Sequence, residues 1–430
     1  MSKKLKLLYD ANILCNGITK NAGRSGIFFT AYNILNELIK RDDIDLTLFI
    51  NSQFYNNALE MLDKEFPNND FKILTDYTNL YYIKLKERRE QLKKEKKNVQ
   101  KFFLQLYMLP FSFFYKKISR KNTIKILNKH HFDIYFSPVY KSPVGLKCKK
   151  YTILYDLIPK ILPEYNSCRW EKGDWFYDLC QSLNEEDYYF TISEYTRQDF
   201  LKHYPVINPS HITTTLLACD EKFKPADMDA IIKAKKKYNL PDKKYVFSLC
   251  TLEPRKNLIR AVKTFIEFIK KNNIDDMYFV LGGGHWEMFI DKLKQEITDL
   301  GEYQNKIIRA GYIDDEDLAP LYSGAEWFVY TSMYEGFGLP PLEAMSCGCP
   351  VITSNNSSLP EVVGDAGIMV DWDSDEQHIE AYEKYYFNKE LREQNRQKGL
   401  KRAKQFSWEK CVNQMMEVML KDSNKVEINS

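Results

Sequence analysis

The sequence of 430 residues lacks any stretch of about 18 consecutive apolar residues, so it predicts no transmembrane helix. Its basic N-terminus has an apolar run that is too short for a signal-peptide core, and we expect a cytoplasmic protein. Positive and negative charges nearly balance, and a net charge of +3 gives no indication of nucleic-acid binding. What remains is an ordinary globular composition, with 44% hydrophobic and 28% charged residues.

Cysteine provides no disulfide framework. Nine cysteines are scattered along the chain, and an odd number argues against complete pairing. The closest pair, Cys347 and Cys349, is separated by one residue, whereas zinc sites prefer at least two intervening residues and need further ligands. We therefore interpret these thiols as small buried side chains in a reducing cytoplasm.

The hydrophobic pattern restarts halfway along the chain, which indicates two similar domains. A buried strand at 5–10 leads into a glycine-rich loop and a helix, and another strand follows at 44–50. The same order returns with a strand at 244–250, so we predict two Rossmann-like α/β units. A polar, basic stretch at 220–244 is bounded by prolines and predicts a linker with a short helix. Further strands are predicted at 132–137, 150–156, 187–193, 277–284, 305–313, 325–332 and 349–354.

The stretch "YEGFGLPPLE" at 334–343 places two carboxylates, Glu335 and Glu343, around glycines and prolines. It follows a predicted strand, and open α/β sheets bind ligands at the carboxyl ends of their strands. The glycines allow close backbone approach to a ligand, and the helix that begins at the prolines favours an anion at its N-terminus. A nucleotide with a sugar at its far end would use both carboxylates. The alternative is a capping role for Glu343, near the first turn of the helix, and a solvated Glu335.

A second motif, "TLEPRKN" at 251–257, follows the first strand of the same domain and opens its helix. Arg255 and Lys256 are adjacent cations there, with Asn257 as a natural helix cap. Positive charge at a helix N-terminus suits a diphosphate, although a solvated basic helix start is the simpler reading of this motif alone. Together the two motifs predict one donor pocket in the C-terminal domain.

Both motifs, their order and their spacing resemble the retaining glycosyltransferases of family 4, the glycosyl transferases group 1. Residues 311–371 are similar to that family almost throughout, with its two signature glutamates as Glu335 and Glu343. Weaker matches at 155–165 and 191–200, and a short glycine-rich one at 23–27, extend the resemblance over the chain.

The resemblance implies the GT-B fold, in which two Rossmann-like α/β domains face each other across a cleft. The acceptor-binding domain would be 1–219 and the donor-binding domain 220–408, with a final helix at 409–423 packing back on the first domain.

The implied reaction moves a hexose from a nucleotide-sugar donor, GDP- or UDP-linked, to a glycan or lipid-linked acceptor with retention of anomeric configuration. Its setting would be bacterial surface polysaccharide or glycoconjugate synthesis. Family members generally need no metal, and the loops 251–257 and 334–343 contain no Asp-x-Asp pair, so we expect no cofactor.

Carried over onto this chain, the family's motifs assign individual roles. Glu335 would contact the donor sugar as a catalytic residue, and Asp156 is a second catalytic candidate. Glu343 would bind the ribose, while Gly26 would face the diphosphate from the N-terminal domain. The full set assigned to donor binding is Arg255, Lys256, Gly336, Phe337, Gly338, Leu339, Glu343 and Gly26.

One departure from the family stands beside Asp156. Many relatives have His-Asp where this chain has Tyr155-Asp156, and Tyr155 does not exchange a proton near neutral pH as His does. We see no evident covalent nucleophile, so we expect front-face attack within an ion pair. Two alternatives stay open: a nucleotide-sugar-binding partner subunit that has lost catalysis, and a GT-B sugar-nucleotide epimerase.

Residues 84–121 are strongly basic and then rich in phenylalanine, including Phe102, Phe103 and Phe114. Such a segment suits peripheral contact with an anionic membrane at the inner face of the cell membrane. Single-stranded nucleic acid is a weaker alternative, because the chain has no nucleic-acid motif. The structural alternative is a solvated helix followed by a core helix.

Overall fold

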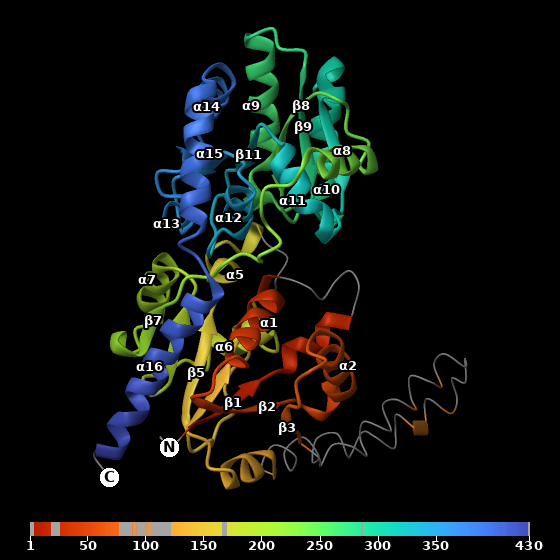
Figure 1. The fold of residues 1–430 in the computed structure, drawn as a ribbon. Helices are drawn as coiled ribbons and strands as arrows, with labels where there is room; N and C mark the ends of the chain where they lie inside the picture. The colour runs from red at the N-terminus through yellow and green to blue at the C-terminus, as the bar shows by residue number, and fades with distance from the viewer. Residues whose placement is uncertain are drawn as a thin grey trace.

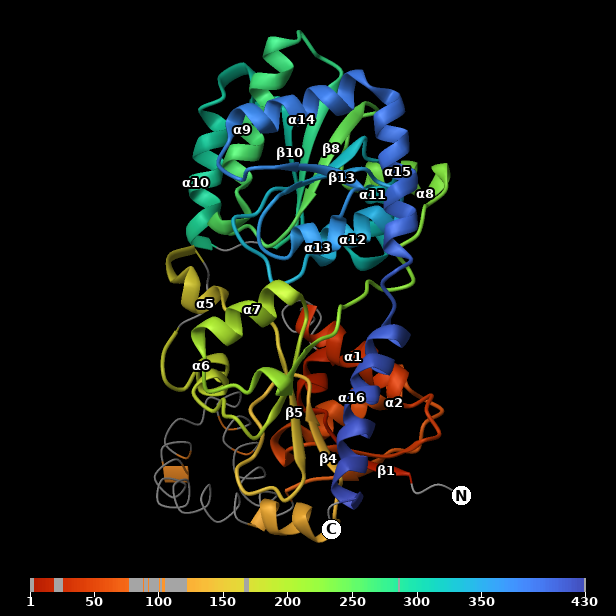
Figure 2. The same ribbon diagram turned by 90° about the vertical axis from the view of Figure 1, so that its left-hand side faces the viewer.

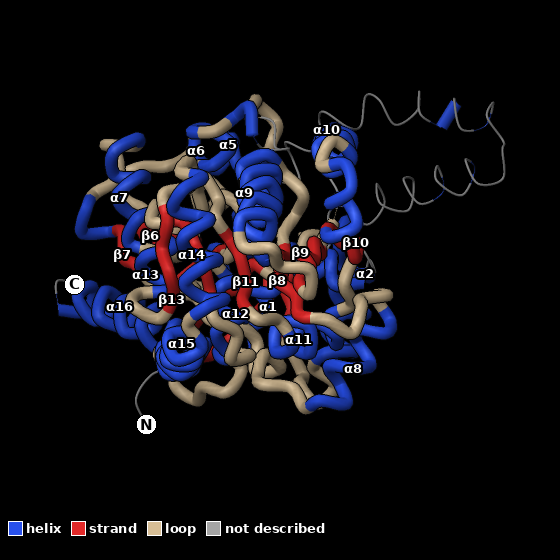
Figure 3. The backbone as a smooth tube through the Cα atoms, turned by 90° about the horizontal axis from the view of Figure 1, so that it is seen from above, coloured by secondary structure: helices blue, strands red, loops and turns tan. Residues whose placement is uncertain are grey.

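The computed structural model describes residues 4–18, 26–76, 88, 92, 100, 103–104, 122–165, 170–284 and 287–428. Within these residues the chain forms two α/β domains stacked end to end, each built on one parallel sheet (Figure 1). Seen from above, helices lie on both sides of the strands (Figure 3). Parallel strands covered on both faces read as nearly continuous apolar runs, which is why β8 (Lys244–Leu249) and β11 (Trp327–Tyr330) were evident in the sequence.

The N-terminal sheet has the order β3-β2-β1-β4-β5-β6-β7. Its strands are β1 (Leu5–Asp10), β2 (Ile44–Phe49), β3 (Lys72–Leu74), β4 (Ile134–Ser137), β5 (Lys149–Leu154), β6 (Tyr188–Thr191) and β7 (Ile212–Thr214). The labelled α-helices of this domain are α1 (Gly26–Leu38), α2 (Tyr55–Glu65), α5 (Ile158–Ile161), α6 (Trp175–Cys180) and α7 (Glu194–His203).

The C-terminal sheet has the order β10-β9-β8-β11-β12-β13. Besides β8 and β11 it contains β9 (Met277–Gly282), β10 (Ile307–Gly311), β12 (Val351–Ser354) and β13 (Gly367–Val370). Its helices are α8 (Met228–Lys237), α9 (Leu258–Lys271), α10 (Glu287–Thr298), α11 (Asp315–Gly324), α12 (Leu339–Ser346), α13 (Leu359–Val363), α14 (Asp375–Phe387) and α15 (Lys389–Ala403).

The last helix, α16 (Trp408–Ile428), leaves the C-terminal domain and runs along the N-terminal one (Figure 2). It packs against α1, and Tyr151 on β5 donates a hydrogen bond to the Asp422 carboxylate at 2.9 Å. A row of the helix's own apolar side chains is buried, namely Cys411, Val412, Met415, Met416 and Met419. The chain therefore passes between the domains twice, once after β7 and once before α16.

The α/β prediction is confirmed, and each strand range predicted from the sequence overlaps a strand of the structure. Three short strands at sheet edges, β3, β7 and β13, were missed. In the predicted linker the short helix is α8, and it packs against α11 in the C-terminal domain.

Two predictions concern membranes. Among the described residues, no helix is both long and apolar enough to cross a bilayer. The basic and aromatic segment 84–121 lies almost entirely outside the described residues, so its membrane contact stays a prediction.

Candidate active site

Three buried charges meet where β8 and β11 end. The Glu335 carboxylate oxygen Oε1 accepts a hydrogen bond from Arg255 Nη1 at 3.0 Å and another from Lys256 Nζ at 2.6 Å. Relative exposures are 9% for the Glu335 side chain, 13% for Arg255 and 7% for Lys256. In this ion triad of Arg255, Lys256 and Glu335, two cations therefore share one carboxylate oxygen, and the Glu253 carboxylate pairs with Arg255 from another side at 3.0 Å.

Neighbouring strands explain how the ion triad assembles. Since β8 and β11 pair in parallel, the loops that follow them emerge at the same edge of the sheet. Arg255 and Lys256 lie in a 3₁₀ turn, and the Arg255 carbonyl accepts the Met333 amide of the second loop at 2.8 Å. Arg255 also donates to the Tyr334 carbonyl at 3.1 Å, so backbone and side chain both join the two motifs.

Asn257 departs from its expected role. It precedes α9 in the left-handed region, with φ of 58°, and its side chain makes no capping hydrogen bond. Instead Asn257 Nδ2 donates to the Trp372 carbonyl at 2.5 Å. The amide side chain thus fixes a neighbouring loop while the α9 N-terminus stays uncapped by it.

Electrostatics in the ion triad favour the charged carboxylate. Burial alone would raise the pKa of Glu335, but Arg255 and Lys256 outweigh it and hold this pKa at about 2. The pKa of Lys256 is lowered, mainly by burial and then by the adjacent Arg255. The Lys256 ammonium also donates to the Tyr330 hydroxyl at 2.6 Å. At neutral pH Glu335 is an anion that accepts hydrogen bonds and does not supply a proton.

The other catalytic candidate, Asp156, reaches the same loop from the opposite domain. It follows β5, and its Oδ1 accepts the Ile158 amide at 3.0 Å. A Cβ added to Gly336 would lie 2.8 Å from Asp156 Cβ and 2.9 Å from its Oδ2, so only glycine permits this approach. Burial raises the pKa of Asp156, and the nearby Arg255 opposes that rise. The structure therefore brings both catalytic candidates together.

The glycine loop presents backbone donors. Within the described residues, no hydrogen bond starts from the amides of Gly336, Phe337 or Gly338. The Phe337 side chain is turned inward and packs edge-on against Phe406 at 6.0 Å. Gly338 precedes α12 with φ of 126°, a conformation that disfavours other residues. Free amides before a helix N-terminus make this loop suited to binding an anion or a hydroxyl oxygen.

Gly26 and Leu339 meet across the domain boundary. Gly26 is the first residue of α1, and a Cβ placed on it would lie 3.6 Å from Leu339 Cδ1. The structure thus brings the start of α1 to the start of α12. Of the assigned donor-binding residues, these two therefore lie next to each other on opposite sides of the domain boundary.

Glu343 is the fifth residue of α12, directly after its first turn, so it lies near the helix start as predicted. Its Oε2 accepts the Tyr322 hydroxyl at 2.9 Å. Burial raises the pKa of Glu343 to about 7, and the Tyr322 hydrogen bond and Lys222 only partly oppose this. The carboxyl group therefore changes its protonation, and with it its ability to accept hydrogen bonds, near neutral pH.

Tyr155 occupies the position where many relatives have His, but its hydroxyl is engaged elsewhere. The ring is 8% exposed in the N-terminal core, and the hydroxyl donates to the Pro138 carbonyl at 2.9 Å. Burial raises the pKa of this hydroxyl well above its usual range. Tyr155 is therefore a structural residue here, and it does not take over proton transfer.

Several residues around the loop were not singled out from the sequence. Ser193 Oγ and Thr196 Oγ1 lie 2.8 and 3.1 Å from the Gly336 carbonyl oxygen. The Glu361 carboxylate accepts the amides of Glu194 and Tyr195 at the N-terminus of α7. The pattern Ser193-x-x-Thr196 would have predicted a helix cap, but not a contact with the other domain.

The described residues include no group of three or more His, Cys, Asp or Glu side chains arranged to hold a metal ion.

Comparison with known proteins identifies the family of this chain. Residues 230–402 match the family described as glycosyl transferases group 1. The chain is 35% identical over 287 residues to O-antigen chain mannosyltransferase B of Escherichia coli, covering 65% of this chain and 72% of that relative. It is 31% identical over 219 residues to the serotype-specific mannosyltransferase WbdA of Escherichia coli, which spans 50% of this chain and 26% of that protein.

The fold has solved counterparts. Anabaena Alr3699/HepE, crystallised in complex with UDP and glucose, superposes with a TM-score of 0.68 over 97% of this chain and all of the other, at 14% identity. This likeness confirms the GT-B prediction for the fold. From the sequence matches and this architecture, we conclude that the chain belongs to the glycosyl transferases group 1 family, that is, glycosyltransferase family 4, and is a glycosyltransferase.

Proposed function

We propose that this enzyme transfers a hexose from a nucleoside diphosphate sugar to a glycan acceptor, with retention, at the ion triad. The observation that carries the proposal is the sharing of Glu335 Oε1 by Arg255 and Lys256 next to three free amides. Two buried cations that lie beside backbone donors suit a diphosphate that carries a sugar.

When a donor is bound, Arg255 and Lys256 exchange the Glu335 carboxylate for the phosphate oxygens. Phosphate oxygens compete with Glu335 for the two cations, because Arg and Lys bind diphosphate as readily as carboxylate. Glu335 is then free to accept a hydrogen bond from a sugar hydroxyl. The cations stay on the diphosphate, where negative charge grows as the bond to the sugar breaks.

The chemical step needs no further charged group from the protein. The bond between the anomeric carbon and the phosphate oxygen breaks, and a bond from the same carbon to the acceptor oxygen forms on the same face. The acceptor proton passes to the departing phosphate oxygen. Asp156 lies beside the Gly336 loop from the opposite domain, its Oδ1 held by the Ile158 amide, and it would orient the acceptor or the sugar.

For the sugar we propose mannose, because the two relatives named above are mannosyltransferases. The acceptor would then be a surface polysaccharide chain, as the name of the O-antigen enzyme suggests. We place the reaction in the cytoplasm, since the cysteines of the described residues are all free thiols. The donor base, guanine or uracil, is left to experiment.

A donor assay tests the proposal. Purified protein is incubated with GDP-mannose, UDP-glucose and related donors, with a mannose-terminated oligosaccharide as acceptor, and release of nucleoside diphosphate is measured. We expect acceptor-dependent release with one donor and almost none from Glu335→Gln. Binding of donors without any turnover would instead support a partner subunit, and a free sugar nucleotide of changed configuration would support an epimerase.

A further inference from the structure

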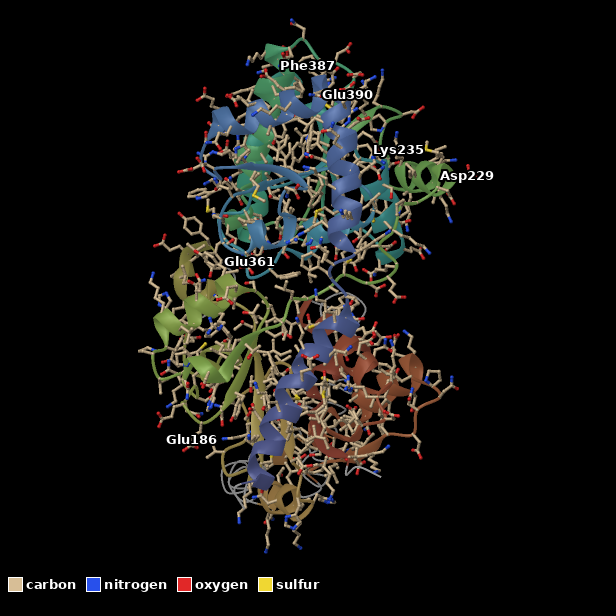
Figure 4. The ribbon with its side chains drawn as sticks, turned by 60° about the vertical axis from the view of Figure 1, so that its left-hand side comes forward. Glu186, Asp229, Lys235, Glu361, Phe387 and Glu390 are labelled. Atoms are coloured by element: carbon tan, nitrogen blue, oxygen red, sulfur yellow. The ribbon has the colours of Figure 1, made fainter. Side chains whose placement is uncertain are left out.

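The N-terminus of α7 is bonded to the opposite domain at several points. Ser193 and Thr196 reach the Gly336 carbonyl, and the Asp199 carboxylate accepts the Tyr334 hydroxyl. The carboxylate of Glu361 on α13 accepts the Glu194 amide of α7 as a further contact between the domains. Figure 4 shows Glu361 at the boundary between the domains. One short segment of the N-terminal domain thus contacts both sides of Glu335 in the sequence, namely residues 334 and 336.

Glu361 caps a helix that belongs to the other domain. Its two oxygens accept the amides of Glu194 and Tyr195 at 2.8 and 2.7 Å, which are donors that a helix leaves unsatisfied at its start. A carboxylate at this end is also favoured by the helix dipole. Arg402 fixes α13 in turn, donating to the carbonyls of Glu361 and Val362 at 2.5 and 3.1 Å. When the domains separate, α7 loses this cap.

The hydroxyl pair acts on a single peptide group. The Gly336 carbonyl lies 2.8 Å from Ser193 Oγ and 3.1 Å from Thr196 Oγ1, and Ser193 and Thr196 are both buried. In a planar trans peptide the N–H points away from the carbonyl, so this contact turns the Phe337 amide away from α7. That amide is among the three free donors of the loop. The N-terminal domain therefore sets the direction of a donor group in the C-terminal domain.

From these contacts we infer that Ser193, Thr196 and Glu361 are positioning residues. They orient the Gly336–Phe337 peptide toward the donor sugar only while the domains are closed, an inference that rests on the proposed function. Arg255 and Lys256 need no partner from the first domain to hold a diphosphate. What the first domain adds is the direction of the Phe337 amide, which Ser193 and Thr196 set through the Gly336 carbonyl.

Kinetics test the hydroxyl pair. In the double variant Ser193→Ala with Thr196→Val, kcat should fall about tenfold or more, while KM for the donor stays within about twofold. Affinity for GDP and UDP, measured by calorimetry, should also stay within about twofold, because the cations are intact. The conservative single variant Ser193→Thr keeps a hydroxyl at this position and should retain most of the wild-type kcat. The matched control is Ser374→Ala, which removes a serine cap of α14 inside one domain and should leave kcat unchanged.

Solution scattering tests the cap without any assay of activity. Glu361→Ala should raise the radius of gyration of the ligand-free protein and speed amide exchange at residues 194–196. The matched control is Asp174→Ala, which removes a carboxylate that caps α6 within its own domain, through the amides of Phe176 and Tyr177. Asp174→Ala should speed exchange at α6 and leave the radius of gyration unchanged.

Failure of this inference and failure of the proposed function would give different results. Wild-type kcat in the Ser193 and Thr196 double variant, or an unchanged radius of gyration in Glu361→Ala, would overturn the inference while Glu335→Gln still tests the proposed function. Full activity of Glu335→Gln would overturn the proposed function. The scattering and exchange measurements would still decide whether Glu361 holds the domains together.

Discussion

At the scale of single residues, the catalytic role proposed for Glu335 gives the first prediction. Its carboxylate is the shared acceptor of two buried cations, and we expect Glu335→Gln to lower transfer by about 100-fold or more, near 3 kcal/mol of transition-state stabilisation. Glu253→Gln is the matched control, because Glu253 is equally buried and also pairs with Arg255, at 3.0 Å. A smaller loss in Glu335→Gln than in Glu253→Gln would contradict the assignment. Melting curves should show both variants folded.

The two cations give a second prediction. Replacing Arg255 and Lys256 together by Ala should weaken binding of GDP or UDP far more than binding of guanosine or uridine, because only the diphosphates need positive charge. Isothermal calorimetry with each pair measures the difference. Arg255→Lys keeps the charge and should lose less. Equal losses for nucleoside and nucleoside diphosphate would show that the cations do not contact phosphate.

Glu343 predicts a pH dependence. Burial raises its pKa to about 7, so the carboxylate form, which we propose as the acceptor for the ribose hydroxyls, is present above pH 7 and is lost below it. Binding of guanosine or uridine should therefore weaken as the pH falls from 8 to 6, since the protonated group accepts fewer hydrogen bonds. Glu343→Gln should bind more weakly at pH 8 and show a flatter profile. A profile for this variant as steep as that of the wild type would assign the titration to another group.

At the scale of elements, α16 links the two domains through apolar packing. Removing residues 406–430 should uncover the surface of α1 that α16 now covers, where the helix also buries its own Cys411, Val412 and Met415. We expect lower solubility and increased binding of a hydrophobic dye, since a large apolar patch on a soluble domain promotes association. Removing residues 424–430 only is the control, and it should behave as the full chain. Unchanged dye binding after the longer truncation would contradict this role.

The elements also show what the sequence could predict. Strands such as β8 and β11 were found because central parallel strands are continuous apolar runs. The missed strands β3, β7 and β13 are three or four residues long and lie at sheet edges, where the apolar pattern is too short to separate from a loop. The start of α12 was predicted from its prolines, and Glu343 lies directly after the first turn, close to where it was predicted.

In the site, residues that lie in short motifs were predictable from the sequence, whereas contacts between residues far apart in the sequence were not. The cations Arg255 and Lys256 and the carboxylate Glu335 each follow a strand in a short motif, so the residues were predictable. The sequence could not predict that both cations bind the same oxygen of Glu335. Lys256 and Arg255 are 79 and 80 residues away from Glu335 in the sequence, on a different loop. The Glu361 contact joins residues 167 apart and in different domains. Such contacts depend on how the domains pack, which no local pattern encodes.

At the scale of the whole molecule, the contact between Gly336 and Asp156 predicts how the domains respond to an added methyl group. Gly336→Ala places a Cβ within 2.9 Å of atoms of the opposite domain, so we expect a more open protein with a larger radius of gyration and a lower kcat. Gly284→Ala is the control, because a Cβ there meets nothing within 4 Å. Solution scattering compares the two variants. The same radius of gyration in both would mean that the closed arrangement tolerates the extra atom.

The central claim is transfer with retention at the ion triad, and the anomeric configuration of the product tests it most directly. Purified enzyme is given an α-linked nucleotide sugar that supports turnover and a defined oligosaccharide acceptor. The one-bond carbon–proton coupling of the new linkage is then read by NMR. We predict an α linkage with the wild-type enzyme and no detectable product with Glu335→Gln in the same time. A β linkage, or equal product from Glu335→Gln, would contradict the account.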